Sequence, residues 1–338
     1  MTKFISRTKN PSVSVISVNF NGEKWLPGFF KSIRNQKGVN VEMIFVDNNS
    51  NDDSLKITQK LFPKAKIIQN KSNLGFGKAN NQGVEIASGE ILFFLNTDIE
   101  IPDPYVLNKM AKYLLDKKVF ILGPRIVDFD GFEVTRGKKM GLDIFSSPGL
   151  SKKLFYIDGC SIMIKKKDFI DLGKFDEKYF MYSEDIDLSW RARLFDKKLA
   201  VYDEVNIKHF GGGSSSSTHL LSKTKHMVPQ FRRYEVEKNN LRNILKNYQF
   251  LTLIFILPLF CLLNLAEALL YLMTRQPRVA RKITSSLWWN FINIDDTLRE
   301  RIIIQKRRKV SDWEIVKQMT FLPNKLVTFF HIGIPKII

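Results

Sequence analysis

Asn96-Thr97-Asp98 is the first polar cluster in the sequence that could perform chemistry, because it directly follows the apolar run Ile91–Leu95. A carboxylate at the end of a buried strand can bind Mg²⁺ or Mn²⁺, which prefer oxygen ligands and often share substrate phosphates. An aspartate in this place can equally cap the following helix. Asp98 is therefore a candidate metal ligand, with helix capping as its alternative role.

Glu184 and Asp185 form a second cluster, at the start of a predicted helix. The helix dipole favours ionised carboxylates at this end, and an ionised Asp185 beside a substrate hydroxyl could act as a general base. An ordinary carboxylate is ionised at neutral pH, so this role requires no large pKa shift. The alternative is that both acids only stabilise the first helical turn. Asp187 is expected either on the helix surface or paired with Arg191.

His209 lies two residues before a glycine run, residues 211–213. Backbone N–H groups of such a loop can surround a diphosphate, and His209 could bind a metal or donate a hydrogen bond to phosphate. Four serines follow the glycines where a phosphate loop would normally lead into a helix. A polar linker with an incidental histidine is therefore the alternative.

Two other segments could contact a ligand through polar atoms. Asp47, followed by Asn48-Asn49-Ser50, could accept hydrogen bonds from a base or a ribose, although Ser50 and Asn51 are also good helix caps. Residues 73–81 are rich in amides, and their glycines would let the backbone approach a ligand closely. This segment could also be only a loop and a helix start.

Short apolar runs alternating with helix-like stretches predict the scaffold that positions these clusters. We expect strands over Val13–Phe20, Val41–Asn48, Ala65–Gln69, Ile91–Leu95, Val119–Leu122, Tyr156–Ile164 (entering a mixed sheet) and Leu199–Tyr202. We expect helices over Trp25–Gln36, Asp52–Phe62, Gly77–Ser88, Tyr105–Asp116 and Asp185–Phe195, the last capped by Ser183, and a turn at Asp130-Gly131. Strands separated by helices imply an α/β fold with a mostly parallel sheet, whose ligands bind beyond the carboxyl ends of the strands.

The formal charge of +19 is unevenly distributed along the 338 residues, with +7 in residues 1–210 and +12 in residues 211–338. The basic excess flanks Phe250–Met273, which is long and apolar enough to cross a bilayer. Pro258, Asn264 and Glu267 weaken a simple crossing. Basic residues lie on both sides, at Lys238, Arg242, Lys246, Arg275, Arg278, Arg281 and Lys282.

These flanks favour a re-entrant or in-plane helical hairpin, bent at Pro258, over a single crossing. Trp288-Trp289 would suit the headgroup level. The alternative is an amphipathic helical pair packed on the catalytic domain or in a dimer interface. Cys160 and Cys261 form no metal-ligand pattern, which fits a reducing compartment and argues against structural zinc. The polar, basic first eleven residues predict no cleaved secretory signal.

The ordered set of motifs resembles glycosyltransferase family 2 over about residues 12–245. The motifs are Val18-Asn19-Phe20-Asn21, Asp47-Asn48-Asn49-Ser50, residues 73–81, Leu95-Asn96-Thr97-Asp98, Glu184-Asp185-Ile186-Asp187-Leu188 and His209-Phe210-Gly211-Gly212. Within the family, the chain looks like the rhamnosyltransferase-like branch that builds bacterial surface polysaccharides. The resemblance implies a GT-A fold, a nucleotide-sugar donor and inversion at the anomeric carbon. The apolar segment and its basic flanks add the expectation of a C-terminal helical membrane-associated region.

The resemblance also implies roles for individual residues. Asp47 would contact the nucleoside, Asp98 the metal and His209 the metal or diphosphate, while Asp185 would be the base beside Glu184. The implied nucleotide-sugar-binding residues are Asn19, Asn21, Asp47, Asn73, Gly75, Lys78, Asn80 and Asn96. The metal would be Mg²⁺ or Mn²⁺. One departure matters, because Asn96-Thr97-Asp98 contains a single carboxylate, so phosphate oxygens would have to complete the coordination sphere.

We therefore expect an inverting, metal-dependent glycosyltransferase on the cytoplasmic face of the membrane. Its partners would be a dTDP-, UDP- or GDP-sugar, a saccharide or polyprenyl-linked acceptor and the membrane surface, without nucleic acid. Expected segments are a tail (1–11), the catalytic domain (12–230), a membrane-associated helical segment (231–290) and a basic helical tail (291–338). A non-catalytic nucleotide-sugar-binding or scaffold subunit is the main alternative. A nucleic-acid-binding module is disfavoured, because the basic residues concentrate around the apolar segment.

Overall fold

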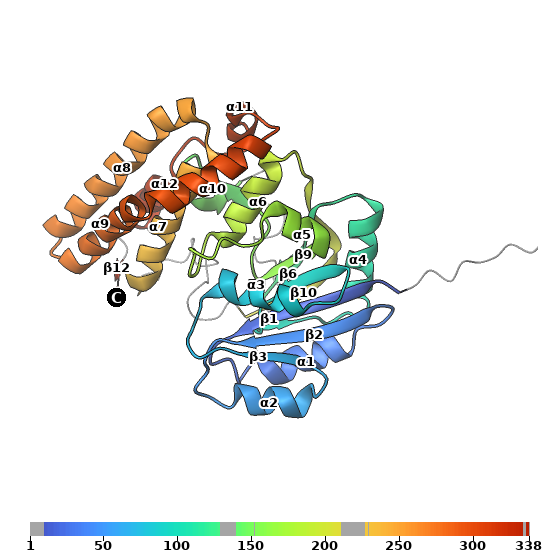
Figure 1. Cartoon of the computed structure of the whole chain (residues 1–338). Helices are drawn as coiled ribbons and strands as arrows, with labels where there is room; N and C mark the ends of the chain where they lie inside the picture. The colour runs from blue at the N-terminus through green and yellow to red at the C-terminus, as the bar shows by residue number, and fades with distance from the viewer. Residues whose placement is uncertain are drawn as a thin grey trace, which may run out of the picture.

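The computed structural model describes residues 10–128, 140–151, 153–210, 227–228, 230–333 and 336–337. An eight-stranded mixed sheet in the order β3-β2-β1-β4-β9-β6-β10-β5 forms its centre (Figure 1). Its strands are β1 (Ser12–Asn19), β2 (Asn40–Asp47), β3 (Lys66–Gln69), β4 (Ile91–Leu95), β5 (Ile99–Glu100), β6 (Ile121–Val127), β9 (Ser161–Lys165) and β10 (Leu199–His209). Two small pairs lie outside it, β7 (Met140–Leu142) with β8 (Pro148–Leu150) and β11 (Met227–Val228) with β12 (Lys336–Ile337).

Strands β1 to β4 are parallel, as their alternation with helices predicts. Strand β9 runs antiparallel to both β4 and β6, which makes the sheet mixed. Side chains alternate between the two faces, so adjacent Phe93 and Phe94 on β4 enter different cores. Both faces must therefore be covered by helices.

Helices cover both faces of the sheet (Figure 1). The core on one side is shared with α1 (Leu26–Arg34), α2 (Ser54–Leu61) and α4 (Val106–Asp116). The core on the other side is shared with α3 (Phe76–Ile86), α5 (Lys166–Leu172) and α6 (Glu184–Leu194). This arrangement confirms the expected α/β class.

Three local expectations are wrong. The expected strand Tyr156–Ile164 begins only at Ser161, and Tyr156 and residues 158–160 line the pocket instead. Strand β10 does not stop at Tyr202, because it continues through an irregularity between Tyr202 and Asn206. Ser183 precedes α6 but makes no capping bond, since its hydroxyl pairs with the Asn240 amide. The Asp130-Gly131 turn lies outside the described residues.

The C-terminal region is helical, as expected. It contains α7 (Gln230–Asn247), α8 (Phe250–Met273), α9 (Pro277–Ile292), α10 (Ile294–Arg307), α11 (Asp312–Val316) and α12 (Asn324–Ile332). Helix α8 is one continuous helix of 24 residues, and the chain reverses between α8 and α9, where Arg275 has a positive φ of 59°. The expected hairpin bent at Pro258 is therefore wrong.

Candidate active site

A pocket of about 480 Å³ lies beyond the carboxyl ends of β1 and β4. Loops that follow these strands, the segment 156–160, the start of α6 and the start of α7 contribute its lining. Of the residues predicted for the site, Asn21, Asn73, Gly75, Asn96, Asp98, Glu184, Asp185 and His209 line it. Sites beyond the carboxyl ends of strands are the ones expected for this sheet type.

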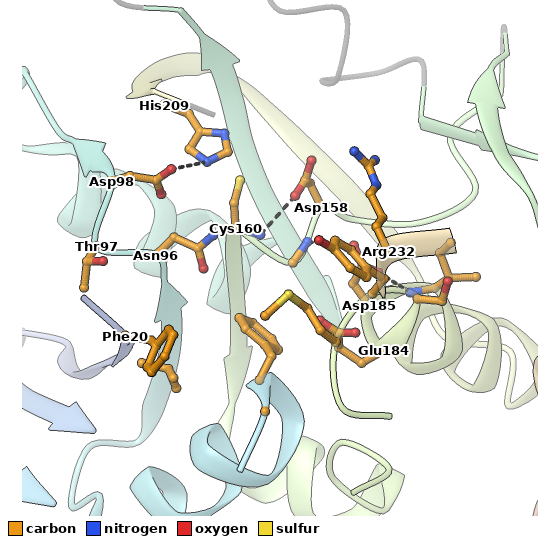
Figure 2. A pocket seen from close by; sticks show the side chains of 18 of the residues that line it. Phe20, Asn96, Thr97, Asp98, Asp158, Cys160, Glu184, Asp185, His209 and Arg232 are labelled. Carbon is orange, nitrogen blue, oxygen red and sulfur yellow. Dashed lines mark hydrogen bonds and ion pairs between the residues drawn. The ribbon is translucent and has the colours of Figure 1, made fainter. Parts of the chain in front are cut away.

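Asp98 and His209 point toward each other at one side of the pocket (Figure 2). His209 Nε2 lies 3.2 Å from Asp98 Oδ2. Their proximity results from the pairing of β5 with β10, which places His209 opposite Ile99, and from a 3.0 Å bond from Phe210 N to the Asp98 carbonyl. Asp98 and His209, 111 positions apart in sequence, are thus brought together because the short edge strand β5, which directly follows Asp98, pairs with the end of β10.

This pair fits part of a divalent-cation site. The His209 side chain is 4% exposed, and its Nε2 makes no hydrogen bond within the described residues, although it faces the Asp98 carboxylate. Within these residues no three His, Cys, Asp or Glu side chains gather in a metal-binding group. Asp98 and His209 would therefore share a metal with oxygen atoms of a bound diphosphate.

Asp185 lies at the other side of the pocket and is partly exposed to it. Its Oδ2 accepts a 2.8 Å hydrogen bond from Gly159 N, and its Oδ1 accepts one of 2.8 Å from Ile186 N. Burial raises the pKa of Asp185 to about 7, and the charge of Asp158 adds to the increase. The role of a base requires no such shift, but the pKa of Asp185 lies above that of an ordinary carboxylate.

Glu184 is buried beside Asp185, with its side chain lining the same pocket. Burial first, and then the charge of Asp185, raises the pKa of Glu184 well above its ordinary value. Its Oε2 makes no hydrogen bond to the residues that the structure describes. The raised pKa favours the protonated carboxyl group of Glu184, which can donate a hydrogen bond, over the ionised carboxylate, which could accept a proton.

Asp187, one turn further into α6, has a structural role. Its carboxylate is fully buried, 2.8 Å from Arg191 Nε and 2.9 Å from Lys246 Nζ. Pairing with Arg191 is confirmed. Lys246 belongs to α7, so Asp187 also joins α6 to the C-terminal helices.

Asp47 and Asn19 lie behind the pocket lining. Asp47 is fully buried and accepts hydrogen bonds from Asn19 Nδ2 at 3.2 Å, Ser50 N at 3.0 Å and Ser50 Oγ at 2.6 Å. These bonds tie the ends of β1 and β2 together, while neighbouring Asn48 lines the pocket. Contact between Asp47 and a nucleoside stays a prediction. It would require the nucleoside to approach a carboxylate that is buried and already bonded to Asn19 and Ser50.

The segment 73–81 divides into lining and supporting residues. Asn73 and Gly75 line the pocket, whereas Lys78 forms a half-exposed pair with Glu177 at 3.8 Å. Asn80 is buried and donates to the Phe76 carbonyl at 3.0 Å. Lys78 and Asn80 thus hold the start of α3, and their binding roles stay predictions.

Several pocket residues were missed by the sequence patterns. Phe20 and Trp25 supply aromatic surface, and Asp158 accepts a 3.0 Å bond from Cys160 N. Arg232, whose guanidinium lies 5.4 Å from the centre of the Tyr182 ring, lies on the side of Glu184 and Asp185 (Figure 2). Arg232 lies in a region with many basic residues, so nothing in the sequence distinguishes it from them. Only the packing of α7 brings its side chain to the pocket. The glycine run after His209 lies outside the described residues.

Residues 14–173 match the model of Glycosyl transferase family 2. A hexosyltransferase of low-salt glycan biosynthesis from Haloferax volcanii is 26% identical over 208 residues, which cover 56% of this chain and 64% of that protein. A GalNAc(5)-diNAcBac-PP-undecaprenol beta-1,3-glucosyltransferase from Campylobacter jejuni is 29% identical over 178 residues, 50% of this chain and 56% of that protein. The chain thus matches less than two thirds of the length of either relative.

Solved structures agree on the fold. The mannosyltransferase PcManGT from Pyrobaculum calidifontis, in complex with GDP-Man and Mn²⁺, has a TM-score of 0.53 and 17% identity, covering 84% of this chain and 76% of its own. TarS from S. aureus has a TM-score of 0.51 and 20% identity, covering 70% and 40%. These similarities confirm the GT-A fold. The family match and the named relatives identify residues 14–173 as a domain of glycosyltransferase family 2.

Proposed function

We propose that this protein transfers a sugar from a nucleotide-sugar to a hydroxyl group of a saccharide or lipid-linked acceptor, with inversion at the anomeric carbon. The observation that carries the proposal is one pocket with the Asp98–His209 pair on one side and Asp185 on the other. A leaving diphosphate needs positive charge, and an attacking hydroxyl needs a base. The two sides of the pocket suit these two needs.

In this mechanism Asp185 takes the proton from the acceptor hydroxyl as its oxygen attacks the anomeric carbon. The bond from that carbon to the diphosphate oxygen breaks, and the nucleoside diphosphate departs with the bonding electrons. Asp98 and His209 would hold Mg²⁺ or Mn²⁺, which would neutralise charge on the departing diphosphate. Gly159 N–H orients the Asp185 carboxylate, since it binds Oδ2.

Glu184 and Arg232 are suited to bind the reactants beside the base. A protonated Glu184 can donate a hydrogen bond to a sugar oxygen, and Arg232 adds positive charge on the same side. The enzyme would act on the cytoplasmic face of the membrane, where nucleotide-sugars are made. The relatives that support a lipid-borne acceptor include the Campylobacter enzyme, whose name describes an undecaprenol-linked glycan.

Incubating the purified protein with UDP-, GDP- and dTDP-sugars, dTDP-rhamnose among them, and measuring nucleoside diphosphate release with and without Mn²⁺ tests the proposal. We expect one donor to be turned over in a metal-dependent manner. A protein that binds a donor but never releases diphosphate, even with membrane extracts supplying acceptors, would instead be the non-catalytic binding subunit. A rhamnosyl donor that is ignored while another is used would remove the rhamnosyltransferase assignment.

A further inference from the structure

Helix α8 has an apolar outer side along its whole length. The exposed residues recur every three or four positions, at Leu251, Phe255, Leu259, Leu262, Leu265, Leu269 and Met273. Phe255 is 70% exposed and Leu262 is 63% exposed. The opposite side, which includes Ile256, Phe260 and Tyr271, is buried against the protein. One side of the helix is therefore packed while the other has no covering among the described residues.

The polar residues of α8 lie on its packed side. Glu267 pairs with Arg233 of α7 and, at 3.4 Å, with Lys325 of α12. Asn264 is buried, and its Oδ1 accepts a 2.9 Å bond from Lys325 Nζ. Asn264 and Glu267, which argued against a simple membrane crossing, are thus paired with residues of other helices. The outer side of α8 consequently exposes only apolar side chains.

We propose that the outer side of α8 is a docking surface for an anionic bilayer, with α8 lying in the membrane plane within one leaflet rather than crossing it. Helices α7 and α9 pack along α8. A crossing would therefore draw their charged side chains to hydrocarbon depth. A helix with one apolar side beside basic residues is the kind that lies at the interface.

The charge beside α8 identifies the occupant as anionic lipid. Arg275, Arg278, Arg281 and Lys282 follow its C-terminal end and are exposed. Clusters of this kind attract anionic headgroups. The outer side of α8 in a second copy would offer these cations no opposite charge. An anionic bilayer, by contrast, supplies both an apolar interior and negative headgroups.

The docking surface is also connected to the wall of the pocket. Met140, Pro148 and Gly149 of the β7–β8 hairpin line the pocket, and Phe145 at its turn packs against Phe260 of α8, with ring centres 6.3 Å apart. Thr320 and Asn324, the first residue of α12, hold the same hairpin, through bonds from Thr320 N to Leu142 O (2.9 Å), Asn324 N to Asp143 Oδ2 (2.7 Å) and Asn324 Nδ2 to Ser147 O (2.8 Å).

Exposed Phe321 and Leu322 lie between these two anchoring residues. A bilayer that contacts α8 would thus lie beside elements that support the pocket. The inference deepens the proposed function, on which it rests for the nature of the acceptor. It gives a physical reason for a lipid-borne acceptor to reach Asp185 from the membrane.

Vesicle flotation of the full chain tests this surface. The probes are phosphatidylcholine vesicles with and without phosphatidylglycerol. The test variant is Phe255→Glu with Leu262→Glu, and the matched control is Tyr105→Glu with Ile170→Glu, which are exposed on the catalytic domain. We expect the wild type and the control to float with anionic vesicles, at least tenfold more than with neutral ones. We expect the test variant to lose at least tenfold of its bound fraction while keeping its melting temperature.

Three outcomes would overturn the proposal. The first is flotation of the test variant like the wild type. The second is a wild type that binds no anionic vesicles and forms a dimer, together with a test variant that is a monomer. This result would assign the surface to contact with a second copy of the chain. The third is a reporter after residue 290 that locates outside the cell, which would indicate a crossing. Flotation needs no turnover, so a protein that floats but releases no diphosphate contradicts only the proposed function.

Discussion

Opposing effects act on the pKa of the Asp185 carboxylate. Two backbone N–H groups and the helix start favour its ionised form, whereas burial and the charge of Asp158 disfavour it. Burial prevails, and the resulting pKa of about 7 lies near neutral pH. A general base is most effective when its pKa lies near the operating pH, since it is then both ionised and basic.

We expect kcat/KM to depend on pH with a pKa near 7. The base must be ionised, so activity is lost as pH falls through that value, by about tenfold per pH unit below it. The raised pKa means that the loss occurs between roughly pH 7 and 5, where an unperturbed aspartate would still be ionised. Initial rates from pH 5.5 to 8.5, with donor binding measured in parallel, check this. A flat profile would contradict the role of Asp185.

Asp185→Asn should lower kcat by about two to four orders of magnitude, because a general base typically contributes that much. Donor affinity should change little, since the amide still fills the site and can accept from Gly159 N. Diphosphate release and equilibrium binding of the donor measure the two quantities. Asp171→Asn, at a largely exposed position in α5, is the control and should behave like the wild type. Near-normal turnover in Asp185→Asn would remove the residue from the mechanism.

Asp98→Ala and His209→Ala should each weaken metal-dependent donor binding. Both side chains lie on the same side of the pocket, so either loss should raise the Mn²⁺ concentration needed for half-maximal activity. Excess EDTA should abolish activity in the wild type, and added Mn²⁺ should restore it. Titration calorimetry of Mn²⁺ with and without the nucleoside diphosphate measures the effect directly. Full activity in EDTA would return Asp98 to the role of a structural residue.

At the scale of elements, Gly75 illustrates how a turn positions the site. Its φ of 81° is rarely adopted by other residues, and an added Cβ would lie 2.2 Å from the Phe180 carbonyl oxygen. Phe76 N donates a 2.8 Å bond to the same oxygen, so the start of α3 rests against the chain that leads into α6. The close approach of these two segments therefore depends on the missing side chain.

Gly75→Ala should destabilise the protein by roughly 1–3 kcal/mol through backbone strain alone, with the steric contact adding to it. Activity should fall too, because Phe180 lies four residues before Glu184. Gly333→Ala is the matched control, since its φ is 73° but nothing lies within 4 Å of the added Cβ. Thermal unfolding and diphosphate release compare the two. Equal effects of both substitutions would show that the contact with Phe180 is unimportant.

The sequence predicted individual helices and strands better than it predicted the contacts between them. Strand β4 ends at Leu95 as its apolar pattern indicates, so Asp98 could be placed at the pocket. The family resemblance placed His209 near the metal of Asp98, but residue patterns alone could not predict this approach, because it depends on a strand that continues past an irregularity. Likewise Arg232 reaches the pocket only through the register of α7. Local sequence patterns indicate the periodicity and the ends of helices and strands. The residues that contact one another across the fold are determined by packing between segments distant in sequence.

At the scale of the molecule, the expected boundary between the catalytic domain and the C-terminal helices does not coincide with a break in packing. Tyr248 is fully buried, with its ring centre 4.9 Å from that of Trp190 in α6. Ile304 and Ile315 share the core that includes α6. Lys246 and Arg242 of α7 pair with Asp176, and Lys246 also reaches Asp187. Burial of this kind joins segments into one cooperative unit.

Deleting residues 248–338 should therefore yield no soluble, active catalytic domain. The deletion removes Tyr248 and the helices that cover the α6 side of the core, which exposes Trp190 and leaves buried charges of α7 without their surroundings. The measurements are soluble yield, circular dichroism and donor binding, with the full-length Phe255→Glu, Leu262→Glu variant as the comparison. That variant removes the apolar surface of α8 and keeps the packed side, so it should unfold in a single transition near the wild-type temperature. A truncated chain that folds and binds donor like the full protein would show that the C-terminal helices are a separable appendage.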